Sequence, residues 1–221
     1  MSDFINTIDV MGDKELAKAI IESTITEFKD NIIQSIGKFA FSYRTKLTSV
    51  DCPNVTEIGE SCFQNCEKLV DVNLPMLETV GGNAFQRCSA LTRISLPKAD
   101  MPTFRYCAKL ELCDLPSATS VGYNAFGGCS SLKAVILRST TLVPLTHATA
   151  FSDCCHFTGT VNATYNPNGD KDGYAYVPRA LVEQYPVETN WAAVLDSDRY
   201  RALEDYTVDG TIYGDLDESK I

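Results

Sequence analysis

The stretch from Cys66 to Cys88 reads C-E-K-L-V-D-V-N-L-P-M-L-E-T-V-G-G-N-A-F-Q-R-C, and variants of it fill most of the chain. Six phenylalanines recur at a nearly constant spacing, and we call them the marker phenylalanines. Each of the last five is followed three residues later by a cysteine, and three residues after that by a leucine or, in the last repeat, by Phe157. A unit of this length cannot bury its own apolar face, so copies must stack into a solenoid. The marker phenylalanines are Phe41, Phe63, Phe85, Phe104, Phe126 and Phe151, spaced by 22, 22, 19, 22 and 25 residues.

Each repeat opens with a short strand signal, as in Leu69-x-x-Val72-x-Leu74-Pro75. The first, fourth and sixth positions are apolar and are predicted to face the core, while the third and fifth face outward. The proline ends the strand because it lacks a donor for the ladder. A glycine then allows a tight bend, at positions 59, 81 and 122. The repeat that starts at Leu91 lacks three residues, so we expect a local kink there.

The pattern L-x-x-[VI]-x-L-P…[IV]-G-x-x-A-F-x-x-C resembles the BspA-type leucine-rich repeat over about residues 25–156. The resemblance implies a right-handed leucine-rich repeat solenoid with a parallel sheet on its concave side. Such a horseshoe of the α/β type would be mostly β, with short irregular or 3-10 outer arcs.

The chain divides into four predicted parts: an N-terminal helical cap (1–24), a solenoid of about six coils (25–156), a small α+β C-terminal cap (157–205) and an acidic tail (206–221). The N-terminal helix would run from an N-cap at Asp13 to about Ser23. In the C-terminal cap we expect strands over 157–165 and 174–177, a helix from 178 to about 185 and a short helix near 189–191. Trp191 would close the end of the solenoid, with Leu181, Val182, Val194 and Leu195.

Charge and hydropathy exclude two classes of partner. The net charge is −10, and the 19 Lys and Arg residues are dispersed, which argues against nucleic acid. No apolar run of about 18 residues is present, so membrane insertion is not expected. The first residues lack the features of a secretory signal. Either the chain is not exported through a secretory signal, or a signal was trimmed. We expect synthesis in the cytoplasm and leave association with a virion or a cell surface open. We also expect a monomer.

Catalytic and metal-binding residues are sparse. Five of the nine cysteines share one repeat position, which predicts a buried column of free thiols. Cys154-Cys155-His156 lacks a second ligand pair at zinc spacing. Counted from Asn168, the twelfth residue of a calcium loop would be Arg179 rather than the required glutamate, which favours a solvated turn. We therefore predict no cofactor, no metal and no enzyme activity; the least unsuitable catalytic residues are His156, Asp170 and Asp172.

The outward positions of the strands form the predicted partner-binding face. Its N-terminal part is polar, whereas its C-terminal part turns apolar, which indicates either an interface or a surface that the C-terminal cap covers. The face consists of Ser49, Asp51, Asp71, Asn73, Arg93, Ser95, Leu112, Asp114, Ala134 and Ile136.

These features favour a non-enzymatic recognition or structural module that presents a solenoid surface to another protein or a glycan. The repeat resemblance implies bacterial surface attachment. The segments 176–185, 190–191 and 202–210 resemble the ends of repeat proteins from gut Firmicutes and their prophages, which implies a prophage-tail role. An intracellular scaffold and an enzyme with a site in the C-terminal region are the alternatives.

Overall fold

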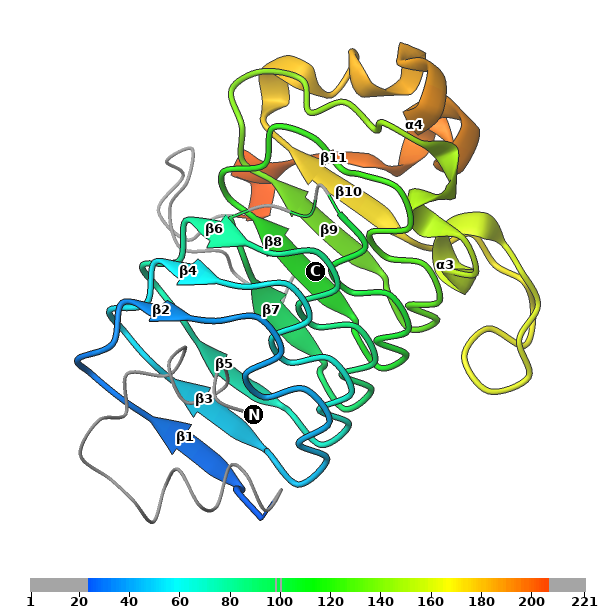
Figure 1. Cartoon of the computed structure of the whole chain (residues 1–221). Coiled ribbons are helices and arrows are strands. Elements are labelled where there is room, and N and C mark those ends of the chain that lie inside the picture. Colours follow the sequence, from blue (N-terminus) through cyan, green and yellow to red (C-terminus); the bar gives the residue numbers. More distant parts are fainter. Residues whose placement is uncertain (1–23, 98, 100, 207–221) are drawn as a thin grey trace.

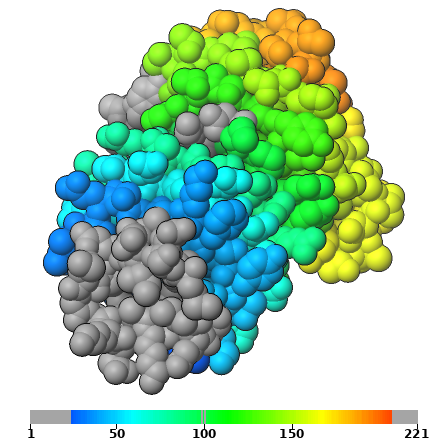
Figure 2. All heavy atoms as spheres, viewed as in Figure 1, coloured from blue at the N-terminus to red at the C-terminus, as the bar shows by residue number. Residues whose placement is uncertain are grey.

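The computed structural model describes residues 24–97, 99 and 101–206. The helix expected over 13–23, and the predicted tail beyond Tyr206, lie outside these residues. The described chain winds into stacked coils, which appear in order of sequence from the first strands to the C-terminal segment (Figures 1 and 2).

The first strand of every coil lies in a row of parallel strands. β1 (Glu27–Lys29), β3 (Ser49–Asp51) and β5 (Asp71–Asn73) form one sheet. The register pairs Phe28 with Val50 and Val50 with Val72, a constant step of 22 residues. The expected parallel sheet is therefore confirmed. A second, five-stranded sheet continues the row with β7 (Arg93–Ser95), β8 (Leu112–Leu115), β9 (Ala134–Leu137), β10 (Tyr174–Val177) and β11 (Tyr200–Ala202).

A second row of short strands lines another side of the coils (Figure 1). It comprises β2 (Ser35–Ile36), β4 (Glu57–Ile58) and β6 (Thr79–Val80), all parallel. The glycines that follow β4 and β6 are needed for a different reason than the predicted bend. A Cβ at Gly81 would collide with the backbone of Gly59 and Glu60 in the preceding coil. Glycine here permits close approach of two coils.

The row of first strands is interrupted between β5 and β7, which are not paired with each other. We call this break the seam. It falls at the start of the coil that is three residues shorter than its neighbours. The outer arc, by contrast, is continuous: the Phe63 amide donates to the Ala84 carbonyl (2.8 Å) and the Phe85 amide donates to the Thr103 carbonyl (3.0 Å). The coils on either side of the seam are therefore joined through the outer arc.

The marker phenylalanines form a continuous stack through the core, with ring centroids 5.1–6.0 Å apart and nearly parallel planes from Phe41 to Phe151. All six side chains are fully buried. The repeat spacing thus places equivalent rings one coil apart, where offset stacking adds to the hydrophobic gain.

The cysteine column has a definite structural role. Each thiol donates a hydrogen bond to the carbonyl of a marker phenylalanine in the preceding coil, with the sulfur 2.9–3.2 Å from the oxygen. A cysteine is small enough for the interior and still satisfies a buried carbonyl. All nine cysteines are buried free thiols. The donors are Cys66, Cys88, Cys107, Cys129 and Cys154.

We expect no thiol of the native protein to react with Ellman's reagent at pH 8, whereas nine should react in denaturant. Burial raises the pKa of Cys66 to about 12 and that of Cys52 to about 12, so the nucleophilic thiolate is scarce. The measurement is the absorbance of released thionitrobenzoate before and after adding guanidinium chloride. Rapid reaction of several thiols in the folded protein would contradict the buried column.

The C-terminal segment, residues 157–206, agrees only partly with the sequence prediction. The strand over 174–177 is confirmed as β10, and the helix near 189–191 is confirmed as α4 (Thr189–Val194). The strand expected over 157–165 is wrong: the chain forms the single-turn helix α3 (Cys155–Thr158), ended by Gly159 in the left-handed conformation, and then a loop. The helix expected from 178 is two 3-10 turns, η2 (Arg179–Leu181) and η3 (Tyr185–Val187). The remaining 3-10 helices are η1 (Ala148–Phe151), η4 (Ser197–Arg199) and η5 (Leu203–Tyr206).

Trp191 lies fully buried against the end of the phenylalanine stack. Its ring centroid is 5.7 Å from that of Phe151 and 5.6 Å from that of Tyr185. The indole nitrogen donates to the Val143 carbonyl at 2.8 Å. Leu181, Val194 and Leu195 belong to the same core cluster, with Val182 packed against it, as the sequence predicted.

Candidate binding face

The polar half of the predicted face is accessible. Asp71, Asn73, Arg93 and Ser95 are exposed on β5 and β7. On β3, Ser49 and Asp51 are half-buried; the Asn73 side-chain amide donates to the Asp51 carboxylate at 2.7 Å. These side chains come from both sides of the seam and face away from the core.

The apolar half of the predicted face is buried; of the two alternatives that the sequence left open, an exposed interface and a surface covered by the C-terminal cap, the second is correct. Leu112, Ala134 and Ile136 are at most 7% exposed, in a separate small cluster with Tyr176 and Leu203. Neither Trp191 nor Val177 covers them, since both belong to the main core.

The cause of this burial is an extension of the sheet. β10 pairs with β9, which sets Tyr174 beside Ala134 and Tyr176 beside Ile136. η5 then adds Leu203, with Tyr206 packed on the same cluster. Asp114, the remaining predicted residue, is largely buried and forms an ion pair with Arg138 at 2.9 Å. Of the ten predicted residues, these four do not form an open surface.

Sequence analysis missed the residues that replace them. Tyr174, Tyr176, Arg201 and Tyr206 come from the C-terminal segment and shape the surface beside β8 and β9. The alternation Tyr174-x-Tyr176 within a predicted strand was the available signal. It would have identified outward positions if that strand had been aligned with the repeat strands.

These tyrosines form one wall of a hollow of about 360 Å³ on the outward face of the second sheet. Charged side chains reach it from the repeat strands and from the loop before β10. We call it the tyrosine hollow. It is lined by Arg93, Glu111, Leu112, Lys133, Ala134, Asp172, Tyr174, Tyr176, Arg201 and Tyr206.

A second hollow of about 460 Å³ lies at the seam. It is lined by apolar and small polar residues without a charged side chain: Val72, Asn73, Leu74, Pro75, Leu77, Ser95, Leu96, Pro97, Pro116 and Ser117.

Two of the three catalytic candidates named from the sequence, His156 and Asp172, are in contact. His156 is buried, and its Nδ1 lies 2.5 Å from the Asp172 carboxylate. Asp172 also lies 4.0 Å from the Lys133 ammonium. Asp170 is exposed. The contact links the loop before β10 to helix α3, which is a structural role.

The residues that the sequence analysis weighed and rejected as zinc or calcium ligands do not form a metal site in the described part of the chain. Among residues 24–97, 99 and 101–206, no three His, Cys, Asp or Glu side chains are grouped so that they could hold a metal ion. The loop is built around Asn166 instead. Its buried side-chain amide donates to the carbonyls of Cys155 (3.0 Å) and Asp170 (2.8 Å), and its oxygen accepts from the Asp170 amide (3.0 Å). The expectation of a solvated turn therefore fails at Asn166.

Replacing Asn166 with alanine is expected to lower the free energy of unfolding by about 1–3 kcal/mol, because buried backbone groups lose their partners. Replacing the exposed Asp170 with alanine should change it by less than about 0.5 kcal/mol. Urea denaturation followed by circular dichroism compares the two. Equal effects would mean that the Asn166 network does not hold the loop.

No helix in the described part of the chain is long and apolar enough to cross a membrane.

The stacked coils, the parallel sheets and the constant register define a leucine-rich repeat solenoid. The BspA type leucine rich repeat region family matches residues 13–101 and 98–165, in six copies. The chain therefore belongs to the BspA-type leucine-rich repeat family.

Solved structures of bacterial leucine-rich repeat proteins are similar to the chain. One from Eubacterium ventriosum shares 19% identity at a TM-score of 0.54, over 65% of this chain and 40% of that one, and supports the fold. The T. pallidum leucine-rich repeat protein shares 30% identity (TM-score 0.44; 48% of this chain and 52% of that one). A leucine-rich cell surface protein from Faecalibacterium prausnitzii shares 28% (TM-score 0.46; 59% and 46%). The chain thus spans about half or less of these relatives. No curated protein matches it.

Proposed function

We propose that the chain is a non-enzymatic binding module that presents its outward sheet face to a protein or a glycan. The observation that carries the proposal is the exposed polar group Asp71, Asn73, Arg93 and Ser95 on β5 and β7. These side chains stand on short strands anchored by a fully buried phenylalanine stack, so the surface is held rigidly. Rigid presentation reduces the entropy lost on binding.

Family membership supports the same function. The match to the BspA-type leucine-rich repeat family, in six copies, favours a module that binds through a repeated surface. We propose a role in surface attachment, with a prophage tail as the alternative setting, and action as a single chain. Neighbouring tail genes would favour the phage setting, whereas a gene encoding a longer protein with a signal or an anchor would favour the cell surface. Light scattering of the purified protein gives its oligomeric state.

The test is binding of the purified full chain to a glycan array and to a panel of purified host surface proteins. We expect a ligand whose binding falls at least tenfold in the double variant Asp51→Lys, Asp71→Lys. The matched control, Glu67→Lys with Glu78→Lys, makes the same charge change at exposed positions outside the face and should bind within about twofold of wild type. Absence of any ligand, or equal loss in both variants, would refute the proposal.

A further inference from the structure

We propose that the tyrosine hollow binds a sugar residue that carries a carboxylate, such as a uronic or sialic acid at the end of a glycan. This inference rests on the proposed binding function and names a ligand class and a second contact area for it. Arg93 belongs both to the polar face and to the hollow, so the two areas adjoin.

The shape of the hollow favours a compact ligand. Its volume of about 360 Å³ lies at the small end of ligand sites and suits roughly one or two sugar rings. Two of its lining residues, Leu112 and Ala134, belong to inner strands of the second sheet, which are paired on both sides. Leu112 and Ala134 therefore offer no free strand edge to an extended peptide, whereas Arg93 and Arg201 reach the hollow from the edge strands β7 and β11.

The tyrosine wall is fixed in place. The rings of Tyr176 and Tyr206 meet edge to face with centroids 4.9 Å apart. Tyr176 is 4% exposed, and burial raises its pKa to about 12, so its hydroxyl stays protonated and can donate. Tyrosine combines an apolar ring face with a polar hydroxyl. The C–H face and the hydroxyls of a sugar ring match that combination.

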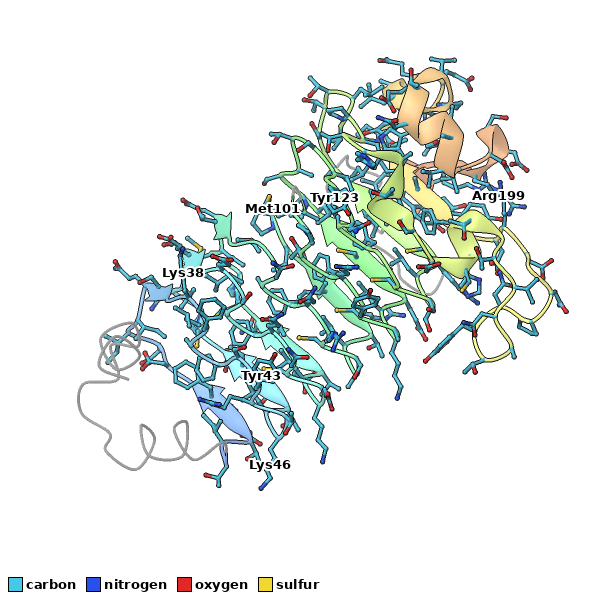
Figure 3. All side chains as sticks on the ribbon, turned by 45° about the vertical axis from the view of Figure 1, so that its right-hand side comes forward. Lys38, Tyr43, Lys46, Met101, Tyr123 and Arg199 are labelled. Carbon is cyan, nitrogen blue, oxygen red and sulfur yellow. The ribbon has the colours of Figure 1, made fainter. Side chains whose placement is uncertain are left out.

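The cations of the hollow are positioned by neighbouring groups. The Arg201 guanidinium lies over the Tyr174 ring at 4.4 Å from its centroid, and it donates to the carbonyls of Asp198 (2.5 Å) and Tyr200 (3.2 Å). Arg199 does not line the hollow, but it lies on the same ring at 5.2 Å and donates to the Tyr174 hydroxyl at 2.8 Å, which helps to position Tyr174. Arg199 is labelled in Figure 3, on the C-terminal segment. A planar guanidinium held in this way is suited to bind a carboxylate.

The charge balance of the hollow is opposite to that of the chain. The whole chain has 29 acidic and 19 basic residues. The hollow has three basic side chains, Arg93, Lys133 and Arg201, against two acidic ones, Glu111 and Asp172. Asp172 contacts His156 and lies 4.0 Å from the Lys133 ammonium, so Arg201 is a cation of the hollow that Asp172 does not pair with. A local cationic excess in an acidic protein concentrates anionic ligands, whereas the hollow at the seam has no charged lining.

The test is a titration of the full chain with D-glucuronate and N-acetylneuraminate, followed by ligand-observed NMR and calorimetry, with glucose and acetate as reference compounds. We expect at least one acidic sugar to bind with a dissociation constant of about 0.1–5 mM. Glucose and acetate should each bind at least tenfold more weakly. Arg201→Gln should weaken acidic-sugar binding about tenfold or more, and Lys133→Gln, at an exposed position, about threefold.

Arg105→Gln is the matched control. Arg105 lies over the Tyr106 ring at 4.7 Å in the same way, but it does not line the hollow. The Arg105→Gln variant should therefore bind acidic sugars as tightly as the wild-type chain. The inference would be overturned if glucose or acetate bound as tightly as the acidic sugars. It would also be overturned if neither acidic sugar bound at 20 mM, about four times the upper limit above, or if both hollow variants bound the acidic sugars as tightly as wild type. Circular dichroism verifies that each variant is folded. If Arg201→Gln does not fold, the binding measured with Lys133→Gln decides the test.

The two proposals fail separately. Loss of array binding in the Asp51, Asp71 double variant with no effect of Arg201→Gln supports the polar face and refutes the hollow. Acidic-sugar binding that needs Arg201 but survives the double variant supports the hollow and refutes the polar face.

Discussion

Replacing Phe85 with alanine is expected to lower the free energy of unfolding by about 3–5 kcal/mol. Phe85 is fully buried, and its ring stacks between those of Phe63 and Phe104, with centroids 5.3 and 6.0 Å away. Truncation removes both contacts and leaves a cavity in a central coil, where neighbouring coils cannot collapse to fill it. Denaturant unfolding followed by circular dichroism measures the loss.

Met76→Ala is the control for Phe85→Ala. Met76 lies in the same coil as Phe85 but is 57% exposed, so its truncation should change the free energy of unfolding by less than about 0.5 kcal/mol. A loss below about 1 kcal/mol for Phe85→Ala would mean that the ring does not occupy the stack.

Replacing Trp191 with alanine should produce a loss of similar size, about 3–5 kcal/mol. The indole covers the end of the stack at Phe151, and its N–H is the hydrogen-bond donor to the Val143 carbonyl. The substitution opens a cavity and leaves a buried carbonyl without that donor. Because Trp191 is the only tryptophan, circular dichroism rather than fluorescence must follow the unfolding.

Two further variants separate the contributions of Trp191. Trp191→Phe keeps an aromatic ring and removes the donor, so it should cost about 1–3 kcal/mol. Val187→Ala, at a position 81% exposed in the same segment, should be nearly neutral. If Trp191→Ala were no worse than Val187→Ala, the end of the stack would not depend on the C-terminal segment.

The solenoid was predictable because each coil repeats the same constraints. Leu, Phe and Cys recur in phase, so an error at one coil is corrected by the others. The inward and outward positions of β3, β5 and β7 follow from that phase and from strand alternation. The sequence did not predict the thiol-to-carbonyl bonds, because spacing identifies a column without showing what each thiol meets.

The C-terminal segment was harder to predict because it has no internal copy for comparison. Gly159 and the Asn166 network turn residues 157–165 away from the extended conformation that their composition suggested. β11 was missed, and β10 was recognised as a strand but not as a continuation of the sheet. For this reason the sequence could not decide whether Leu112 and Ile136 are exposed or covered by the C-terminal segment, and the tyrosine hollow was not foreseen.

We expect the seam to divide the array into two cooperative blocks. In a stack of repeats, cooperativity passes from coil to coil through nearest-neighbour contacts. All neighbouring strands of the first-strand row except β5 and β7 are paired, and their ladder hydrogen bonds contribute to this coupling. Between β5 and β7 the coupling rests on the outer arc and on the ring contact of Phe85 with Phe104. The N-terminal coils can therefore exchange their amide hydrogens through openings that leave β8 to β11 closed. The polar face spans this junction, so a ligand bridging Asp71 and Arg93 would also bind the two blocks together.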